Sequence, residues 1–268
     1  MKSYMKLLWI AVVCGVLNIY CGIIDHTSIS LSSIVFAMGF GEVIYYPNQI
    51  SEVMYWYVPL LLFHIFYGTF LYRHFCSASV YYFSRTDNRL GWYIGETVKL
   101  FCLCVLYLTV MLVTGIGVVV CFMRLEYKTE SFYLLFYYLL LFSLFLFVST
   151  LSINVLSVLW NSAVAFCLVE GIYTLGISVY LSMGLWTDST YLKEHMAWLR
   201  MNPFVHLVFC VHSSKIGGIN QIINEDKFIF DLNESVALYL IAAVIVIILG
   251  GIIVKKHDFI LLDKEREG

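Results

Sequence analysis

The stretch that decides the fold runs from residue 131 to residue 169 and reads SFYLLFYYLLLFSLFLFVSTLSINVLSVLWNSAVAFCLV. It contains 39 residues and no charged side chain. A helix rises about 1.5 Å per residue, so about 20 apolar residues cross about 30 Å of hydrocarbon, and this run is too long for one crossing. The polar Trp160-Asn161-Ser162 within it predicts a tight turn between two membrane helices.

Four further uncharged, apolar runs lie at residues 7–24, 53–72, 100–123 and 235–254. Together with the hairpin they predict an all-α integral membrane protein. We expect one transmembrane domain over residues 1–268, because no repeat, linker or low-complexity block divides the chain. The six expected transmembrane helices lie at about 5–24, 53–73, 99–122, 132–159, 163–184 and 235–254.

Composition supports a membrane protein and argues against two other classes. The chain is 61% hydrophobic and 13% charged, with a mean hydropathy of +0.86, so it has more apolar surface than a soluble domain of this length can bury. A net charge of −2 argues against nucleic acid as a partner. The eight cysteines form no spacing typical of a metal site, and we interpret those in apolar runs as small packing residues: Cys14, Cys21, Cys102, Cys104, Cys121 and Cys167.

The placement of lysine and arginine predicts the orientation, because cytoplasmic segments retain positive charge. With the N-terminus inside, the six helices leave ten of these residues in cytoplasmic segments and six in longer external segments. We therefore expect both ends of the chain in the cytoplasm. The cytoplasmic set is Lys2, Lys6, Arg73, Arg85, Arg89, Lys99, Lys255, Lys256, Lys264 and Arg266, and the external set is Arg124, Lys128, Lys193, Arg200, Lys215 and Lys227.

Two apolar stretches are too short or too irregular to cross the membrane. Residues 26–41 are expected to dip into the outer interface. Residues 195–211, which include Asn202 and Pro203, lie in the external segment before the last helix. They predict either a folded external cap or a re-entrant hairpin, since irregular backbone at membrane depth must be covered by protein or line a cavity.

Two ionisable residues fall inside expected helices. An acid at the centre of a membrane helix costs about 2.5–3.5 kcal/mol on insertion scales, so such residues are candidates for a functional site. Glu170 is a candidate proton site, or else an acid near the cytoplasmic interface that is bonded to a neighbouring helix. His64 is a candidate partner for it, or else a hydrogen-bonding residue between packed helices. A proton relay requires the two side chains to be adjacent.

The motifs of common enzymes are missing from the sequence. It has no phosphate-binding Gly-x-x-x-x-Gly-Lys-Ser/Thr loop, no His-Glu-x-x-His and no Gly-x-Ser-x-Gly. We therefore expect no catalytic residues, no metal and no cofactor bound by this chain.

The cytoplasmic segment between the second and third expected helices, residues 73–99, is the most informative. Val80 and Phe83 offer an apolar surface, Arg85 and Arg89 are spaced one helical turn apart, and Trp92 follows three residues later. This pattern predicts a compact amphipathic element. The alternative is a simple positively charged loop with an interfacial aromatic anchor.

At these residues the chain resembles the membrane subunits of type-2 ABC exporters, particularly the six-helix permeases of bacteriocin and peptide-antibiotic systems. The pattern comprises Phe83, Ser84, Arg85, Asn88, Arg89 and Trp92. The general layout is also similar, including an Asn-Pro pair at Asn202-Pro203 before the last helix. In one departure, this chain has only a handful of residues before its first helix, where the family commonly has an amphipathic connecting helix.

The resemblance implies the transmembrane subunit of an ATP-driven exporter in a cell membrane, the bacterial plasma membrane. A separate cytoplasmic ATPase subunit would hold ATP and Mg, dock on the 76–92 segment and drive transport, and a second permease copy or a related permease would complete the pathway. Aromatic and aliphatic helices favour an amphipathic or hydrophobic cargo, such as a peptide antibiotic or a lipid-like molecule. Two other classes stay open: a membrane immunity or sensor protein that transports nothing, and a proton-coupled secondary transporter that uses Glu170.

Overall fold

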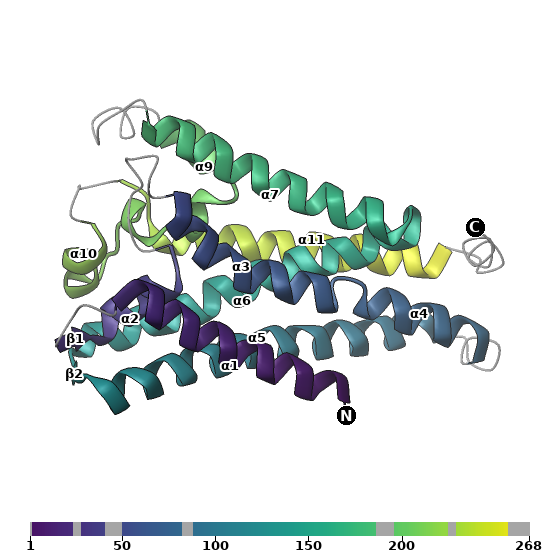
Figure 1. The fold of residues 1–268 in the computed structure, drawn as a ribbon. Helices are drawn as coiled ribbons and strands as arrows, with labels where there is room; N and C mark the ends of the chain where they lie inside the picture. Colours follow the sequence, from purple (N-terminus) through teal and green to yellow (C-terminus); the bar gives the residue numbers. More distant parts are fainter. Residues whose placement is uncertain are drawn as a thin grey trace.

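The structure is a computed structural model that describes residues 2–23, 28–40, 50–81, 88–185, 196–224 and 229–256. Its six longer helices run beside one another as an elongated bundle (Figure 1). The first described helix begins, and the last described helix ends, at the same end of this bundle, which we call the terminal end (Figure 1). The six helices are α1 (Lys2–Ile23), α3 (Ile50–Tyr67), α5 (Arg89–Phe122), α6 (Thr129–Leu159), α7 (Ser162–Leu185) and α11 (Leu232–Lys256).

Four of these helices are long and apolar enough to cross a membrane, namely α5, α6, α11 and the Ser162–Ser182 part of α7. The apolar part of α1, Met5–Cys21, is shorter. The chain is therefore a mostly helical protein with the helices of a membrane protein, as the sequence predicts. Helices α6 and α7 meet at a turn over Trp160 and Asn161, where the hairpin was expected.

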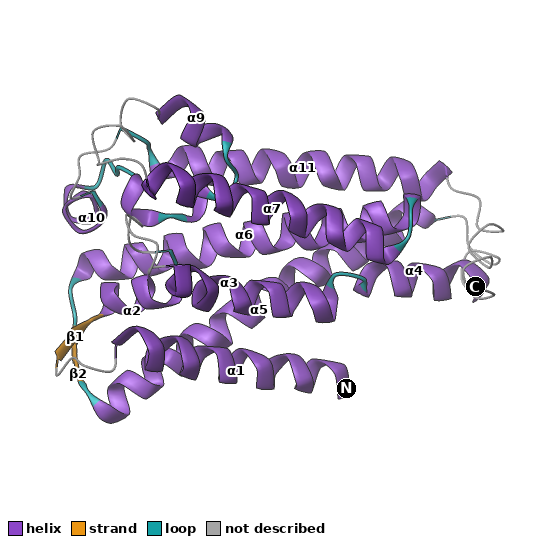
Figure 2. Cartoon of the chain, turned by 45° about the horizontal axis from the view of Figure 1, so that its top comes forward, coloured by secondary structure: helices purple, strands orange, loops and turns teal. Residues whose placement is uncertain are grey.

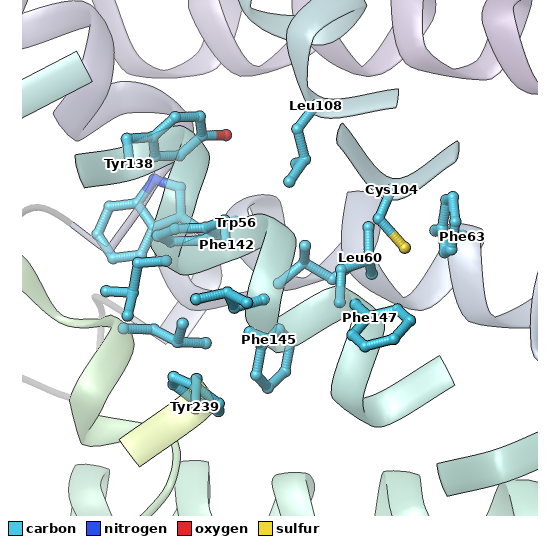
Figure 3. Close-up of a cluster of buried hydrophobic side chains, with 14 of the residues drawn as sticks. Trp56, Leu60, Phe63, Cys104, Leu108, Tyr138, Phe142, Phe145, Phe147 and Tyr239 are labelled. Atoms are coloured by element: carbon cyan, nitrogen blue, oxygen red, sulfur yellow. The ribbon is translucent and has the colours of Figure 1, made fainter. Parts of the chain in front are cut away.

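Helix α6 is the central helix of the bundle and packs against α5, α7 and α11 (Figure 2). Several of its buried hydroxyl groups bond to carbonyls of their own helix: Ser149 Oγ lies 2.8 Å from the carbonyl of Phe145, and Thr150 Oγ1 lies 2.6 Å from that of Leu146. Such bonds let hydroxyl groups sit in an apolar interior. Aromatic side chains fill the space around α6, including Trp56, Phe142, Phe145 and Tyr239 (Figure 3).

The second predicted helix, 53–73, is interrupted in the structure. Helix α3 ends at Tyr67, and α4 (Phe70–Tyr81) begins after Gly68 and Thr69. The first turn of a helix has backbone N–H groups without a partner in the helix, and buried Asn154 of α6 accepts one of them from Tyr72 at 2.9 Å. The uncharged run of residues 53–72 continues through this break, so the composition of the run alone did not predict the break.

The segment expected to dip into the outer interface contains a short strand and a buried helix. Strand β1 (Ser28–Ser30) pairs in parallel with β2 (Arg124–Glu126), with Ile29 opposite Leu125. Helix α2 (Leu31–Met38) follows directly, and the hydroxyl of Ser30 caps it by accepting the Ser33 N–H at 3.2 Å. The all-α prediction therefore needs a small correction, because the two connections pair their backbone polar groups in a strand ladder.

Short elements between α7 and α11 close the end of the bundle opposite the termini, which we call the cap end (Figure 1). They are α9 (Met196–Met201), the 3₁₀ turns η2 (Val205–Leu207) and η3 (Phe209–Val211), and α10 (Gly217–Ile223). The Phe209 N–H donates to the carbonyl of Phe40 at 2.8 Å, so this segment is tied to the residues after α2. We refer to residues 196–224 as the cap.

The interpretation of the six cysteines as packing residues is wrong for four of them. Cys14 and Cys104 are buried, whereas Cys21, Cys102, Cys121 and Cys167 are exposed on the bundle. An apolar run does not reveal which of its side chains face other helices and which face lipid, because both environments favour the same residue types.

Candidate functional site

Four polar side chains from three helices meet inside the bundle. Tyr57 and His64 lie seven residues apart on α3 and therefore share a face of that helix. Glu170 comes from α7 and Ser149 from α6. We refer to these four residues as the polar cluster.

Glu170 is the centre of the polar cluster. The Tyr57 hydroxyl donates to its Oε2, and its Oε1 lies 2.5 Å from His64 Nδ1. The other ring nitrogen of His64, Nε2, lies 2.7 Å from Ser149 Oγ. Sequence reasoning singled out Glu170 and His64 separately, and the structure brings them into contact.

The contact between His64 and Glu170 is close but imperfectly directed. At 2.5 Å the two atoms satisfy the distance of an ion pair, yet neither Nδ1 nor Oε1 has a partner with the direction of a regular hydrogen bond. Both atoms are buried. We therefore treat this contact as one that requires a proton between the two atoms.

The polar cluster is well shielded. The Glu170 residue is 8% exposed and His64 1%. Aromatic rings surround it: Phe145 lies 6.4 Å from the His64 ring and 4.7 Å from that of Tyr173. A charge in such surroundings is costly unless it is paired, so the proton content of the cluster affects its energy strongly.

A second buried carboxylate lies nearer the terminal end, and sequence reasoning missed it. Glu96 of α5 contacts His74 Nδ1 of α4 at 3.0 Å and Lys99 Nζ at 2.6 Å. The i, i+3 spacing of Glu96 and Lys99 was a readable signal for a helical pair. The contact with His74 required knowledge of how α4 packs on α5.

The structure describes part of the expected ATPase-coupling segment. Asn88 is the N-cap of α5, and its Oδ1 accepts the Gly91 N–H at 2.9 Å. Arg89 is the first residue of that helix. Trp92 packs partly against Phe75 of α4, with ring centroids 5.8 Å apart. Val80 lies in α4 by its backbone, and Phe83, Ser84 and Arg85 fall outside the described residues.

Asn202 and Pro203 reach into the bundle from the cap. Asn202 Nδ2 donates to the carbonyl of Gly176 on α7 at 2.8 Å, and the Pro203 carbonyl accepts the Tyr239 hydroxyl of α11 at 2.6 Å. Gly176 lies nine residues before the end of α7, which places this contact about 14 Å along the helix from its cap end.

Two cap histidines share one hydroxyl group. Ser235 Oγ lies 2.9 Å from His206 Nδ1 and 2.7 Å from His212 Nε2. The opposite ring nitrogens face the carbonyls of Arg200 and Val208 at 2.8 and 2.7 Å. Burial lowers the pKa of His206, and it lowers the pKa of His212 to about 3. Burial therefore favours the neutral form of each imidazole.

No group of three or more metal-ligating side chains occurs within the part of the chain that the structure describes. The chain matches no known protein family, no curated protein and no solved structure.

Proposed function

We propose that this chain is the transmembrane subunit of an ATP-driven exporter for an amphipathic or hydrophobic substrate. In this proposal all six long helices cross a cell membrane, the terminal end faces the cytoplasm and a separate ATPase subunit binds there. The cap then faces outward, with residues 202–211 as a re-entrant segment.

The observation that carries the proposal is the length and charge distribution of α5. Its 34 residues correspond to about 51 Å, well beyond the roughly 30 Å of the hydrocarbon. Residues 100–122 are uncharged, whereas Arg89, Glu96 and Lys99 all lie in the first third. The excess length therefore emerges at the terminal end, where α4 packs beside it (Figure 1). Two helices that continue out of the membrane at this end supply a rigid element for transmitting movement.

Two further features support this architecture. An even number of crossings returns the chain to the side on which it began, which agrees with the common end of α1 and α11. The irregular backbone of residues 202–211 is covered by protein, because Phe204, Val205 and Phe209 are each at most 1% exposed. Protein cover is the condition under which irregular backbone survives at membrane depth.

The experiment is co-purification of an ATPase subunit from the native membrane with the full-length chain. We expect Phe83→Ala combined with Arg89→Glu to detach the ATPase while membrane abundance is unchanged. Burial of an aromatic contributes about 1.5–3 kcal/mol and an exposed ion pair about 0–1 kcal/mol, so Phe83→Ala alone should weaken binding more than Arg85→Ala alone. Arg124→Glu, a charge reversal at the cap end, is the matched control and should retain the ATPase.

If every variant keeps the ATPase at the wild-type yield, the coupling surface lies elsewhere. If no ATPase co-purifies with the unmodified chain, the exporter proposal fails and an immunity or sensor protein becomes the better explanation.

The contact between Glu170 and His64 favours a second candidate, a proton-coupled secondary transporter. Adjacency of these two side chains was the condition for a proton relay, and the structure fulfils it. Transport that stops when the proton gradient is collapsed, while ATP is present, would favour this candidate over the exporter.

A further inference from the structure

We propose that the polar cluster is a binding site for a single proton and that this proton fastens α7 to α3. Such a site goes beyond the proposed function, and it applies whether ATP or a proton gradient drives transport. We derive it by counting the hydrogen atoms that the contacts of Tyr57, His64, Ser149 and Glu170 require.

The count begins at Ser149. Its hydroxyl has one hydrogen, which it donates to the carbonyl of Phe145 at 2.8 Å within α6. The Leu146 carbonyl also lies 3.1 Å from this hydroxyl, and both carbonyls can only accept. We therefore assign the Ser149 hydrogen to the carbonyls and the hydrogen of the 2.7 Å contact to His64 Nε2, which leaves Nδ1 to face Glu170.

The count ends at the carboxyl group. Tyr57 supplies the hydrogen for its contact with Glu170 Oε2. The 2.5 Å contact between Glu170 Oε1 and His64 Nδ1 still lacks one. One proton completes it, either on the ring, which gives an imidazolium and a carboxylate, or on the carboxyl group, which leaves both neutral. The cluster has no net charge in both cases.

Any other proton content leaves an unpaired buried charge. Without the proton, a carboxylate faces the lone pair of a neutral ring. With a second proton, a carboxylic acid faces an imidazolium. The remaining titratable groups nearby are Tyr57 on α3, Tyr173 on α7 and Tyr239 on α11, and no described Lys or Arg forms an ion pair with Glu170. No permanent cation can therefore substitute for the proton.

The shared proton acts between two helices that otherwise have few close contacts among the described residues. Glu170 is the only charged residue of α7, and both of its partners on α3, Tyr57 and His64, depend on it. Loss of the proton, or gain of a second one, should therefore loosen α7 from α3.

Substitution by glutamine tests this count directly. In Glu170→Gln, the amide oxygen accepts from Tyr57 and the amide N–H donates to His64 Nδ1, so a permanent hydrogen replaces the shared proton. In Glu170→Ala, both partners lose their bond. Glu96→Gln is the matched control, because Glu96 also contacts a histidine but has Lys99 as a permanent cation.

The first measurement is the thermal unfolding midpoint of the full chain in lipid nanodiscs between about pH 5 and 9. We expect the unfolding midpoint of the unmodified chain to be highest at one pH and to fall at both lower and higher pH, because the cluster then holds one proton too many or one too few. Glu170→Gln should lose the fall on the alkaline side, because the amide hydrogen that replaces the shared proton is not released, and Glu96→Gln should retain both sides. Glu170→Ala should melt roughly 5 °C or more below Glu170→Gln at every pH, since it leaves buried groups unpaired.

The second measurement is the distance between nitroxide labels at Tyr55 on α3 and Val179 on α7, both exposed positions, with the exposed cysteines replaced. The distance distribution should be narrow for Glu170→Gln at neutral and alkaline pH and broad for Glu170→Ala. If Glu170→Ala does not accumulate, His64→Gln replaces it. Its amide can offer an N–H to Glu170 and cannot become a cation, so the fall of the midpoint on the acid side should disappear, whereas the fall on the alkaline side should remain because Glu170 can still lose its proton.

The proposal is overturned if the pH profiles of the unmodified chain and Glu170→Gln coincide. It is also overturned if Glu170→Gln melts as low as Glu170→Ala, or if the label distances do not respond to either variant. None of these outcomes depends on ATPase binding, so the exporter proposal and this one fail separately.

Discussion

Asn202 donates through Nδ2 to the carbonyl of Gly176 at 2.8 Å, and the approach is possible because residue 176 has no side chain. A Cβ atom there would stand 2.7 Å from Asn202 Oδ1. The same Oδ1 accepts the Phe204 N–H at 3.0 Å, so one amide side chain both attaches the cap to α7 and shapes the turn after α9.

We therefore expect Gly176→Ala to displace Asn202 and destabilise the protein by about 1–3 kcal/mol, the usual cost of overpacking. Gly171→Ala on the same helix is the control, because no atom lies within 4 Å of the added Cβ. It should be neutral or stabilising by up to about 1 kcal/mol, since alanine is the better helix former. Thermal unfolding in lipid nanodiscs compares the two variants, and equal midpoints would contradict the role of this contact.

A second close approach lies between α5 and α11, where a side chain at Gly250 would collide with the hydroxyl of Tyr93. That hydroxyl is buried and forms no hydrogen bond of regular geometry among the described residues. Tyr93→Phe should therefore be neutral or slightly stabilising, because it removes an unpaired buried group. Gly250→Ala should destabilise by about 1–3 kcal/mol, and the double variant should recover part of that loss. A double-mutant cycle of unfolding midpoints without such coupling would rule out the contact.

The buried histidines of the cap predict a loss of stability in acid. Both His206 and His212 have a lower pKa in the folded chain than the ordinary value of 6.5. The unfolded chain then binds more protons below about pH 6.5, so this contribution is complete above that pH and is lost as the pH falls toward 3. The slope is about 1.4 kcal/mol per pH unit for each neutral imidazole. The charged groups that interact with them are Arg200, Glu234 and Asp231.

The measurement is the drop in the unfolding midpoint between pH 7.5 and pH 5 (roughly the upper half of that window). His212→Gln should show a smaller drop than the unmodified chain, because glutamine does not titrate. His74→Gln, at a half-exposed histidine of α4, is the control and should leave the drop unchanged. If His212→Gln keeps the full drop, the acid sensitivity arises elsewhere.

The orientation of the chain predicts which positions react with a membrane-impermeant thiol reagent on intact cells. In a chain without its natural cysteines, single cysteines at Asn48 and Lys215 should react, and those at Lys2, Asn88 and Lys264 should react only after the cells are opened. Reaction of a cysteine at position 88 on intact cells would show that the topology is the opposite of the proposed one and would exclude an ATPase at the terminal end.

The long helices could be predicted because their residues satisfy a local rule: a run of about 20 apolar side chains must lie in lipid. The break at Gly68 and Thr69 obeys no such rule, since it depends on Asn154 of another helix accepting the Tyr72 N–H. The pairing of β1 with β2 likewise joins segments about a hundred residues apart.

Only two of the four residues of the polar cluster could be predicted from the sequence, for the same reason. Glu170 and His64 are conspicuous because an ionisable residue is rare in a membrane helix. Tyr57 and Ser149 are ordinary residues in an aromatic and apolar chain, and nothing local distinguishes them from the other tyrosines and serines. The seven-residue spacing of Tyr57 and His64 was a usable signal for a shared face, but it did not identify the carboxylate that they contact.

The pairing of β1 with β2 has a mechanical consequence for α5. Strand β2 begins two residues after α5 ends, so the strand ladder fixes the position of the helix at its cap end. Helix α5 also packs against α1, α6 and α11, so a rotation of α5 about this point has to move those helices with it. At the other end of α5, about 51 Å away, a rotation of about 10° displaces the helix by about 9 Å.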